Sequence, residues 1–262
     1  MRRGQRRLPF DGRALVVPVG FLVLAEIAAR AAGYQSSSLP WPSEILTAGV
    51  GALLDGSILR ATGQTLLSAA GGLAIGSSLG LVLGALMGIF LIFHRLAEVT
   101  IECLRPIPSV ALIPIVLLIF GLGYAMEITL IAKTSFWPML LLTIAAVRGV
   151  KPRLLEVAKL LRMGLVARIA KVVIPAALPG IFVGFRLAVG AALVVAVTVE
   201  IAANPLGLGY AMMRAQEALR PDLVFAYLIW IGIVGWLING SLVAVQRRLF
   251  SGAPHPSEEP AQ

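Results

Sequence analysis

RGVKPRLLEVAKLLRMGLVARIAKVVIPAALP, residues 148–179, is a polar segment between two long apolar runs. It contains seven Lys or Arg side chains and a single acidic one, Glu156. A connection between neighbouring helices usually needs roughly 2–8 residues, and this segment is several times longer. Apolar side chains recur in it at the spacing of one face of an amphipathic helix: Leu154, Leu155, Ala158, Leu161 and Leu165. We therefore predict a basic helical hairpin that docks onto another protein or onto a lipid surface.

Composition on either side of this segment indicates a membrane protein. Hydrophobic residues make up 58% of the 262-residue chain, charged residues 13%, and the mean hydropathy is +0.92. A helix needs about 20 apolar residues to cross the hydrocarbon core of a bilayer. We predict an all-α membrane protein with about six spans, at 14–32, 64–92, 106–123, 126–147, 177–203 and 223–246. Its parts are a basic N-terminal tail, a membrane domain and a disordered C-terminal tail, at 1–13, 14–250 and 251–262.

Basic residues are distributed unequally between the two sides that these spans define. With the N-terminus in the cytoplasm, sixteen Lys or Arg residues fall on the cytoplasmic side and four on the other side. Such a bias is typical of cytoplasmic loops, so we place both termini and the 148–175 loop in the cytoplasm. The net charge of +9 then reflects topology and contact with anionic lipid. It does not indicate nucleic-acid binding, because the bases are spread over four segments without a soluble domain.

The first predicted span also fits a second interpretation. Basic residues followed by an apolar run and by Ala29-Arg30-Ala31 are typical of a signal peptide with a cleavage site. However, the charges of Glu26 and Arg30 fall where such a peptide carries small neutral residues. We therefore interpret the segment as a retained span.

The second predicted span contains a row of glycines at every fourth position: Gly72, Gly76, Gly80, Gly84 and Gly88. A row without side chains allows another helix backbone to approach closely. We favour packing within the chain over contact with a second subunit. The same stretch, Gly76-Ser77-Ser78-Leu79-Gly80, matches the GxSxG pattern of hydrolases. That pattern requires a strand before the serine, whereas a continuous apolar helix is predicted here.

Other signatures of enzymes and metal sites are missing from the sequence. There is no HExxH motif and no phosphate-binding loop of the GxxxxGK[ST] type. The single cysteine, Cys103, allows no intrachain disulfide and no cysteine-based metal cluster. We therefore expect no catalytic residue, no metal site and no bound cofactor on this chain.

Four charged residues fall within or near predicted spans: Glu127, Lys133, Arg186 and Glu200. A charge at the centre of a membrane helix costs roughly 2.5–3.5 kcal/mol on insertion scales and usually faces a cavity or a partner. For Arg186 and Glu200 two interpretations stay open, namely mutual pairing or snorkelling and a polar translocation path. For Glu127 we favour pairing or snorkelling.

The basic segment resembles the EAA loop of ABC-transporter permeases, whose pattern is E-A-A-x3-G-x9-I-x-L-P. Glu156-Val157-Ala158 begins the pattern, and Val172-Val173-Ile174-Pro175 closes it at the expected distance. Arg162 stands where the family has its glycine, and Gly164 follows two residues later. The resemblance implies that the loop contacts an ATPase through Glu156, Val157, Ala158, Arg162, Gly164, Val172, Ile174 and Pro175.

The rest of the chain extends this resemblance over nearly all of residues 34–250. It is similar to permease subunits of the nitrate/sulfonate/taurine branch of ABC importers. The matching motifs are Leu39-Pro40-Trp41-Pro42-Ser43, Arg105-Pro106-Ile107-Pro108-Ser109, Pro114, Phe120-Gly121-Leu122-Gly123, Phe136-Trp137-Pro138, Val147-Arg148-Gly149-Val150, Phe185-Arg186-Leu187, and Glu200 with Gly207-Leu208-Gly209-Tyr210.

This resemblance implies the fold and the partners of a type I importer in a bacterial inner membrane. Two permease copies, expected to form a homodimer, would associate with two ATPase subunits and with an extracytoplasmic solute-binding protein. ATP and magnesium would be bound by the ATPases. The solute would be a small organic or inorganic anion such as a sulfonate, taurine or nitrate, although selection rests largely on the binding protein.

The prolines of the third predicted span interrupt backbone hydrogen bonding and would allow it to bend where a path opens. We therefore take as translocation-path candidates Pro106, Pro108, Ser109, Pro114, Arg186 and Glu200. Two other classes of function were weighed. An ion-coupled secondary transporter would leave the 148–175 loop unexplained, and a membrane enzyme would need reactive groups that the sequence lacks.

Overall fold

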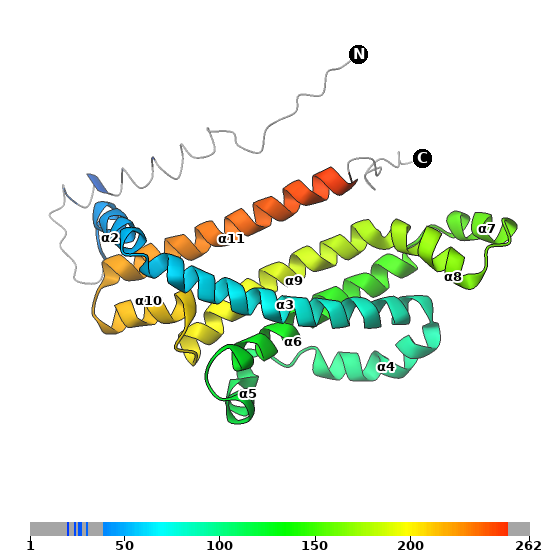
Figure 1. Ribbon diagram of the computed structural model, residues 1–262, viewed down its shortest axis with the longest axis horizontal. Coiled ribbons are helices and arrows are strands. Elements are labelled where there is room, and N and C mark those ends of the chain that lie inside the picture. Colours follow the sequence, from blue (N-terminus) through cyan, green and yellow to red (C-terminus); the bar gives the residue numbers. More distant parts are fainter. Residues whose placement is uncertain (1–19, 21–23, 25, 28–29, 31–38, 251–262) are drawn as a thin grey trace, which may run out of the picture. The chain divides into compact units, whose positions relative to one another are not determined.

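The computed structural model describes residues 39–250 together with Gly20, Leu24, Glu26, Ile27 and Arg30 (Figure 1). Every regular element of this described part is helical, which confirms the all-α prediction there. The elements are α2 (Pro42–Leu54), α3 (Ser57–Ile89), α4 (Leu91–Leu104), the 3-10 turn η1 (Val110–Leu112), α5 (Ile113–Phe120), α6 (Tyr124–Arg148), α7 (Pro152–Leu160), α8 (Leu165–Arg168), the π-helical turn η2 (Ile169–Val173), α9 (Ile174–Ala202), α10 (Gly207–Glu217) and α11 (Pro221–Phe250). The predicted tails, 1–13 and 251–262, and most of the predicted first span lie outside the described residues.

Four described helical segments are long and apolar enough to cross a membrane. They are Ser57–Ile89, Tyr124–Arg148, Leu165–Glu217 and Pro221–Phe250. The predicted spans 64–92, 126–147 and 223–246 each coincide with one of them, to within a few residues at one end or the other. The predicted span 177–203 lies inside the segment Leu165–Glu217 and coincides with its helix α9. The hydropathy pattern therefore located these four helices correctly.

The predicted third span, 106–123, is not one helix. Helix α4 begins two residues after α3 ends, and the regular structure then stops at Leu104. Pro106 and Pro108 lack the N–H that an α-helix needs to continue its hydrogen bonding. Pro114 has the opposite effect, because it lies in the first turn of α5, where the backbone N–H groups have no partner within the helix.

The described residues fall into two compact units. The smaller one comprises the described residues up to Leu59 together with residues 211–230. In it, the hydroxyl of Ser43 donates to Oε1 of Glu26 at 2.9 Å, and the guanidinium of Arg30 donates to the same oxygen at 2.8 Å. The two charges that argued against a cleavage site thus contact each other and the first turn of α2.

The larger unit, residues 60–210 and 231–262, is organised around the glycine row of α3. Each glycine of the row lies against α6, which runs beside α3 in Figure 1. A Cβ atom added to Gly76 would lie 2.2 Å from the carbonyl oxygen of Ala132, and one added to Gly84 would lie 2.7 Å from that of Leu140. Contacts this short leave no room for a side chain, so the backbones of α3 and α6 touch directly.

A second row of small residues, on α9, faces the same unit. Gly184, Ala188, Ala192 and Ala196 are buried and spaced by four residues. A Cβ atom on Gly184 would lie 2.9 Å from the Cβ of Leu142 of α6, while Ala192 and Ala196 pack with Ile131. Helix α6 is therefore held between α3 and α9 by small residues on both neighbours.

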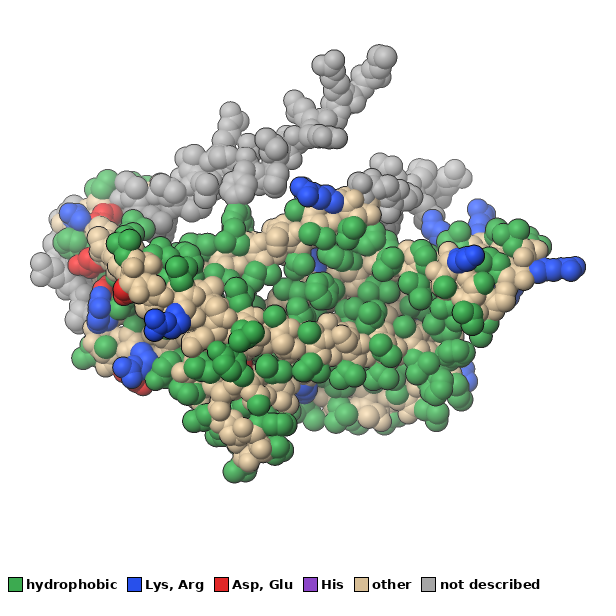
Figure 2. All heavy atoms as spheres, in the orientation of Figure 1, with side chains coloured by type: hydrophobic (Ala, Val, Ile, Leu, Met, Phe, Trp, Pro, Cys, Tyr) green, Lys and Arg blue, Asp and Glu red, His purple; other side chains and the backbone are tan. Residues whose placement is uncertain are grey.

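The outer surface of these helices is apolar, whereas basic side chains gather over α7 and α8 (Figure 2). Large hydrophobic side chains are exposed along the long helices; Val82, for example, is 65% exposed. A water-soluble monomer rarely shows such extended apolar surface. This surface fits the hydrocarbon core of a bilayer.

We predict that Gly76→Ala lowers the stability of the folded protein by about 1–3 kcal/mol, because the new methyl group overpacks the contact with the Ala132 carbonyl. Gly63→Ala is the matched control. It lies on the same helix with nothing within 4 Å of an added Cβ, and it should be neutral or stabilising, since alanine favours a helix over glycine. Thermal unfolding in detergent measures both. Equal effects of the two substitutions would contradict a specific backbone contact.

Candidate coupling loop and translocation path

The predicted hairpin at 148–175 is formed by α7 and α8 and is anchored on one side only. Ala158 is 1% exposed, and Leu155 packs against a buried cluster at the base of the loop. That cluster is Val147, Val150, Val173 and Ala177. Glu156 and Val157 are exposed on the opposite side of α7. Helix α7 thus packs on the ends of the long helices through one face, and its other face is exposed.

Arg162 adopts the left-handed conformation that favours glycine, with φ of +50°. It follows the end of α7, where the amide of Arg162 donates to the carbonyl of Lys159 at 2.9 Å and that of Met163 donates to the carbonyl of Ala158 at 3.0 Å. These two bonds form a Schellman motif, a helix ending that usually carries glycine at this position. Gly164, by contrast, has an ordinary φ of −63°. Arg162, at the glycine position of the EAA pattern, therefore adopts the backbone conformation that a glycine would favour there.

The loop joins α9 through the π-helical turn η2. The amide of Ile174 bonds to the carbonyl of Ile169, five residues earlier. Pro175 follows directly in the first turn of α9. A proline ring collides with the carbonyl four residues before it in an α-helix, and the wider π turn accounts for how the helix continues through this point. Val172 is half-buried and Ile174 exposed, so these loop residues flank the junction.

A pocket of about 490 Å³ lies between the loop and the neighbouring ends of α3 and α6. Its lining includes the basic side chains Arg148, Lys159 and Arg168. The guanidinium of Arg148 donates to the carbonyl of Met87 at 3.0 Å, at the end of α3. Movement of the loop would therefore reach α3 and α6 as well as α9.

The helix break at 105–109 is tied to two consecutive residues of α6. The ammonium group of Lys133 donates to the carbonyl of Ile107, and the hydroxyls of Ser109 and Thr134 are 2.5 Å apart. Non-helical backbone is tolerated at membrane depth only where it is buried in protein or lines an aqueous cavity. The Lys133 contact supplies a partner for a backbone carbonyl of the break, and the Ser109–Thr134 contact joins the side chains of the break to α6.

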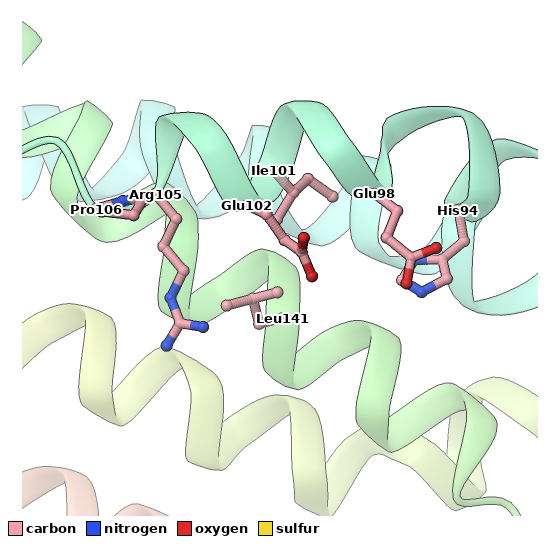
Figure 3. Close-up of a pocket in the computed structure, with 7 residues that line it drawn as sticks. All are labelled: His94, Glu98, Ile101, Glu102, Arg105, Pro106 and Leu141. Atoms are coloured by element: carbon pink, nitrogen blue, oxygen red, sulfur yellow. The ribbon is translucent and has the colours of Figure 1, made fainter.

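A second pocket, of about 510 Å³, lies beside α4 and is open to the surface (Figure 3). His94, Glu98 and Glu102 occupy successive turns of α4 and point to the side on which Leu141 of α6 lies. Arg105 and Pro106, which follow the end of α4, also line this pocket. The predicted site residues do not include these three residues of α4, because the third span was placed after them. Their four-residue spacing nevertheless marks one polar helix face.

The structure does not bring all six path candidates together. Pro106, Pro108 and Ser109 lie in the helix break, close to Pro114 at the start of α5. Arg186, on α9, donates from Nε to the side-chain oxygen of Asn239 of α11 at 3.0 Å. Glu200 lies fourteen residues further along α9, about 21 Å at 1.5 Å per residue, and is 1% exposed.

Comparison with known proteins agrees with this architecture. Residues 76–252 match the family model described as "Binding-protein-dependent transport system inner membrane component". The chain belongs to this family. The resemblance to transport permeases inferred from the EAA loop is thereby confirmed. The family comprises membrane components of transport systems, so this permease is a transport subunit rather than an ATPase.

Individual relatives carry the same family features. The permease is 31% identical over 231 residues to the putative aliphatic sulfonates transport permease protein SsuC of Escherichia coli, covering 88% of each chain. It is 35% identical over 150 residues to the protein of the same description from Bacillus subtilis, where the match covers 57% of this chain but only 54% of the relative. Among solved structures it resembles the MetNI methionine ABC transporter in inward-facing conformations, with a TM-score of 0.65, 18% identity and coverage of 72% of this chain and 94% of that one. The last match shows a shared fold.

We predict that Arg162→Gly stabilises the permease by about 1 kcal/mol, because glycine adopts the left-handed conformation without the steric cost that other residues bear. Arg162→Val should destabilise it, since a β-branched side chain fits this conformation least well. Gly164→Ala is the control and should be tolerated, because its φ is ordinary and an added Cβ meets nothing within 4 Å. Chemical unfolding of the three variants tests the order. Destabilisation by Gly164→Ala together with no gain from Arg162→Gly would contradict it.

Proposed function

We propose that this permease is the membrane-spanning subunit of an ATP-driven importer and that the α7–α8 hairpin couples it to the ATPase. The observation that carries the proposal is the construction of the hairpin. Ala158 and Leu155 fix it to the ends of α6 and α9, while Glu156, Val157 and Arg162 are presented outward. An outward-facing basic surface on a firmly anchored helix suits a protein partner whose movement must be passed on to the membrane helices.

The nucleotide chemistry belongs to the partner in this proposal. The permease sequence has no phosphate-binding loop, so ATP and magnesium would bind to two ATPase subunits. Two permease copies, expected to be identical, would enclose the path, and an extracytoplasmic binding protein would deliver the solute. The membrane domain would contain six spans per copy, with the first at 14–32 and the third divided into α4 and α5.

We further propose that the solute path runs along the broken third span. Pro106, Pro108, Ser109 and Pro114 would form its flexible wall, while Arg186 and the α4 pocket would add charged groups. The proposed solute class is a small anion, such as an aliphatic sulfonate, taurine or nitrate. The names of the E. coli and B. subtilis relatives, both described as aliphatic sulfonate permeases, support this class. We place Glu200 in a structural cluster rather than on the path, because it is enclosed within the helices.

The coupling proposal predicts that Glu156→Ala leaves membrane insertion intact but weakens ATPase association or uncouples ATP hydrolysis from uptake. For crosslinking, the exposed Cys103 is first replaced by serine. Cysteines at Leu160, Leu161 and Val166, which are 70–82% exposed, should then crosslink to the ATPase with a yield that changes when nucleotide is added. A cysteine at Val82, on the outer face of α3, is the control and should not crosslink. Uptake that survives deletion of the 151–171 segment in an inserted protein would refute the proposed role.

Topology provides an independent prediction. The excess of basic residues on one side places both termini in the cytoplasm. A reporter fused after Leu249 should therefore give a cytoplasmic signal, and one inserted after Arg60 should give an extracytoplasmic signal. Signals from the same compartment would exclude the arrangement of six spans.

A further inference from the structure

A buried polar cluster lies at one end of the packed helices α3, α6 and α9. It comprises Thr65 and Ser68 of α3, Glu127 of α6, and Glu200 and Asn204 at the end of α9, each at most 1% exposed. Ser68 extends the glycine row of α3 by one step of four residues, and Glu200 does the same for the small-residue row of α9. The rows of small residues on α3 and α9 therefore both lead to the cluster that contains the two buried carboxyl groups.

Each carboxyl group has one oxygen with a hydrogen-bond donor. The side-chain amide of Asn204 donates to Oε2 of Glu127 at 2.5 Å, and the backbone amide of Gly209 donates to Oε2 of Glu200 at 2.8 Å. Gly209 lies in the first turn of α10, an eleven-residue helix. The positive end of the α10 dipole therefore favours a negative charge on Glu200.

The other oxygen of each carboxyl group is buried and has no donor. Oε1 of Glu127 and Oε1 of Glu200 have no hydrogen-bond partner in the described residues. The two side chains belong to one cluster, because Asn204, which donates to Glu127, follows Glu200 by four residues. The hydroxyls of Thr65 and Ser68 lie beside them, but each donates its one proton to a backbone carbonyl of α3. Each hydroxyl can donate to a glutamate only by giving up its bond to the backbone of α3.

No positive charge compensates this pair among the described residues. The groups that face it from α3, α9 and α10 are hydroxyls, a side-chain amide and backbone amides. On the α5 side, Val116 and Ile113 pack with Met126 and Val199, which adjoin the two glutamates in sequence. Two carboxylates enclosed in this way would repel each other, and each would bear the cost of removal from water.

We propose that Glu127 and Glu200 form a proton-binding site, in which one proton is held between Oε1 of Glu127 and Oε1 of Glu200. Binding converts one carboxylate into a carboxylic acid, whose O–H then donates to the remaining carboxylate. This single proton satisfies both orphaned oxygens and removes one of two buried charges, and hydrogen bonds of this charged type are short and strong. The proton belongs to the pair of carboxyl groups and not to one glutamate. The ligand of this site is thus a proton, and the site does not depend on the solute or on the coupling role proposed above.

The bound proton would hold the turn between α9 and α10 against α3. The backbone amide of Gly207 donates to the side chain of Gln64 at 3.0 Å, and that of Leu208 donates to the hydroxyl of Thr65 at 2.9 Å. A Cβ atom on Gly207 would lie 1.9 Å from Oε1 of Glu200, so the backbone closes directly over this carboxyl group. Loss of the proton would place two negative charges beneath the turn and weaken these contacts.

The pH dependence of stability follows from this arrangement. The unfolded chain has ordinary carboxylates without a proton at neutral pH, whereas the folded chain retains one. Stability should therefore fall as the pH rises from the range in which ordinary carboxyl groups titrate, with the unfolding equilibrium constant increasing up to tenfold per pH unit until the folded protein releases the proton. In Glu127→Gln the amide donates permanently to Glu200, so this fall in stability with pH should disappear.

The direct test is infrared spectroscopy of the full-length permease in lipid nanodiscs, with glutamate labelled by ¹³C at the carboxyl carbon. We expect the carbonyl band of a protonated glutamic acid at neutral pH, its loss at alkaline pH together with a drop in Tm, and its absence from Glu127→Gln. Glu200→Gln is a second variant that removes the same band should Glu127→Gln not fold. Glu217→Gln, an exposed residue at the end of α10, is the matched control and should keep both the band and the fall in stability with pH.

Three results would overturn the proposal. The parent protein could lack the protonated band at neutral pH, or the band could persist in both Glu127→Gln and Glu200→Gln. The third contrary result concerns metal ions. If sodium or calcium ions raised the Tm of the parent protein at constant ionic strength but not the Tm of the variants, the site would bind a metal cation instead of a proton.

Discussion

The direct contact between the backbones of α3 and α6 is the constraint on which the rest of the larger unit depends. Five glycines on α3 leave no side chain between the two helices, so van der Waals contact and helix geometry fix their separation. In lipid, where burial of apolar surface gives helices little reason to associate, such close packing is a main source of cohesion. Helix α9 packs onto the other side of α6 in the same way. The 148–175 loop, the helix break and the buried glutamates all attach to this three-helix assembly.

The features that sequence predicted well are those whose signal is local. The glycine row is visible within thirty residues, and basic composition with helical spacing identifies the hairpin without knowledge of its surroundings. Four spans were found because a long apolar segment has few alternatives in a membrane protein. The EAA pattern identified the loop but not its turn geometry, because Arg162 stands at the glycine position. The structure shows that Arg162 adopts the left-handed conformation there, since the Schellman hydrogen bonds require a backbone conformation and not a particular residue.

The features that sequence missed depend on residues far apart in the chain. The break in the third span is stabilised by Lys133 and Thr134 from the next helix, and an average of hydropathy over a window cannot register such partners. The pairing of Glu127 with Asn204 links residues seventy-seven positions apart. One local signal was available, however. Gly184, Ala188, Ala192, Ala196 and Glu200 have the same spacing as the glycine row, which would have placed Glu200 on a packed face.

The π-helical turn between α8 and α9 has a mechanical consequence. It accommodates one more residue per turn than an α-helix, and one residue corresponds to a rotation of about 100° and a rise of about 1.5 Å in an α-helix. The hairpin therefore approaches α9 with an angular offset that a continuous α-helix of the same sequence would not have. A change from π-helical to α-helical winding at Ile169–Val173 would rotate the α7–α8 hairpin about the axis of α9. The hydrogen bonds of α9 itself would stay unbroken.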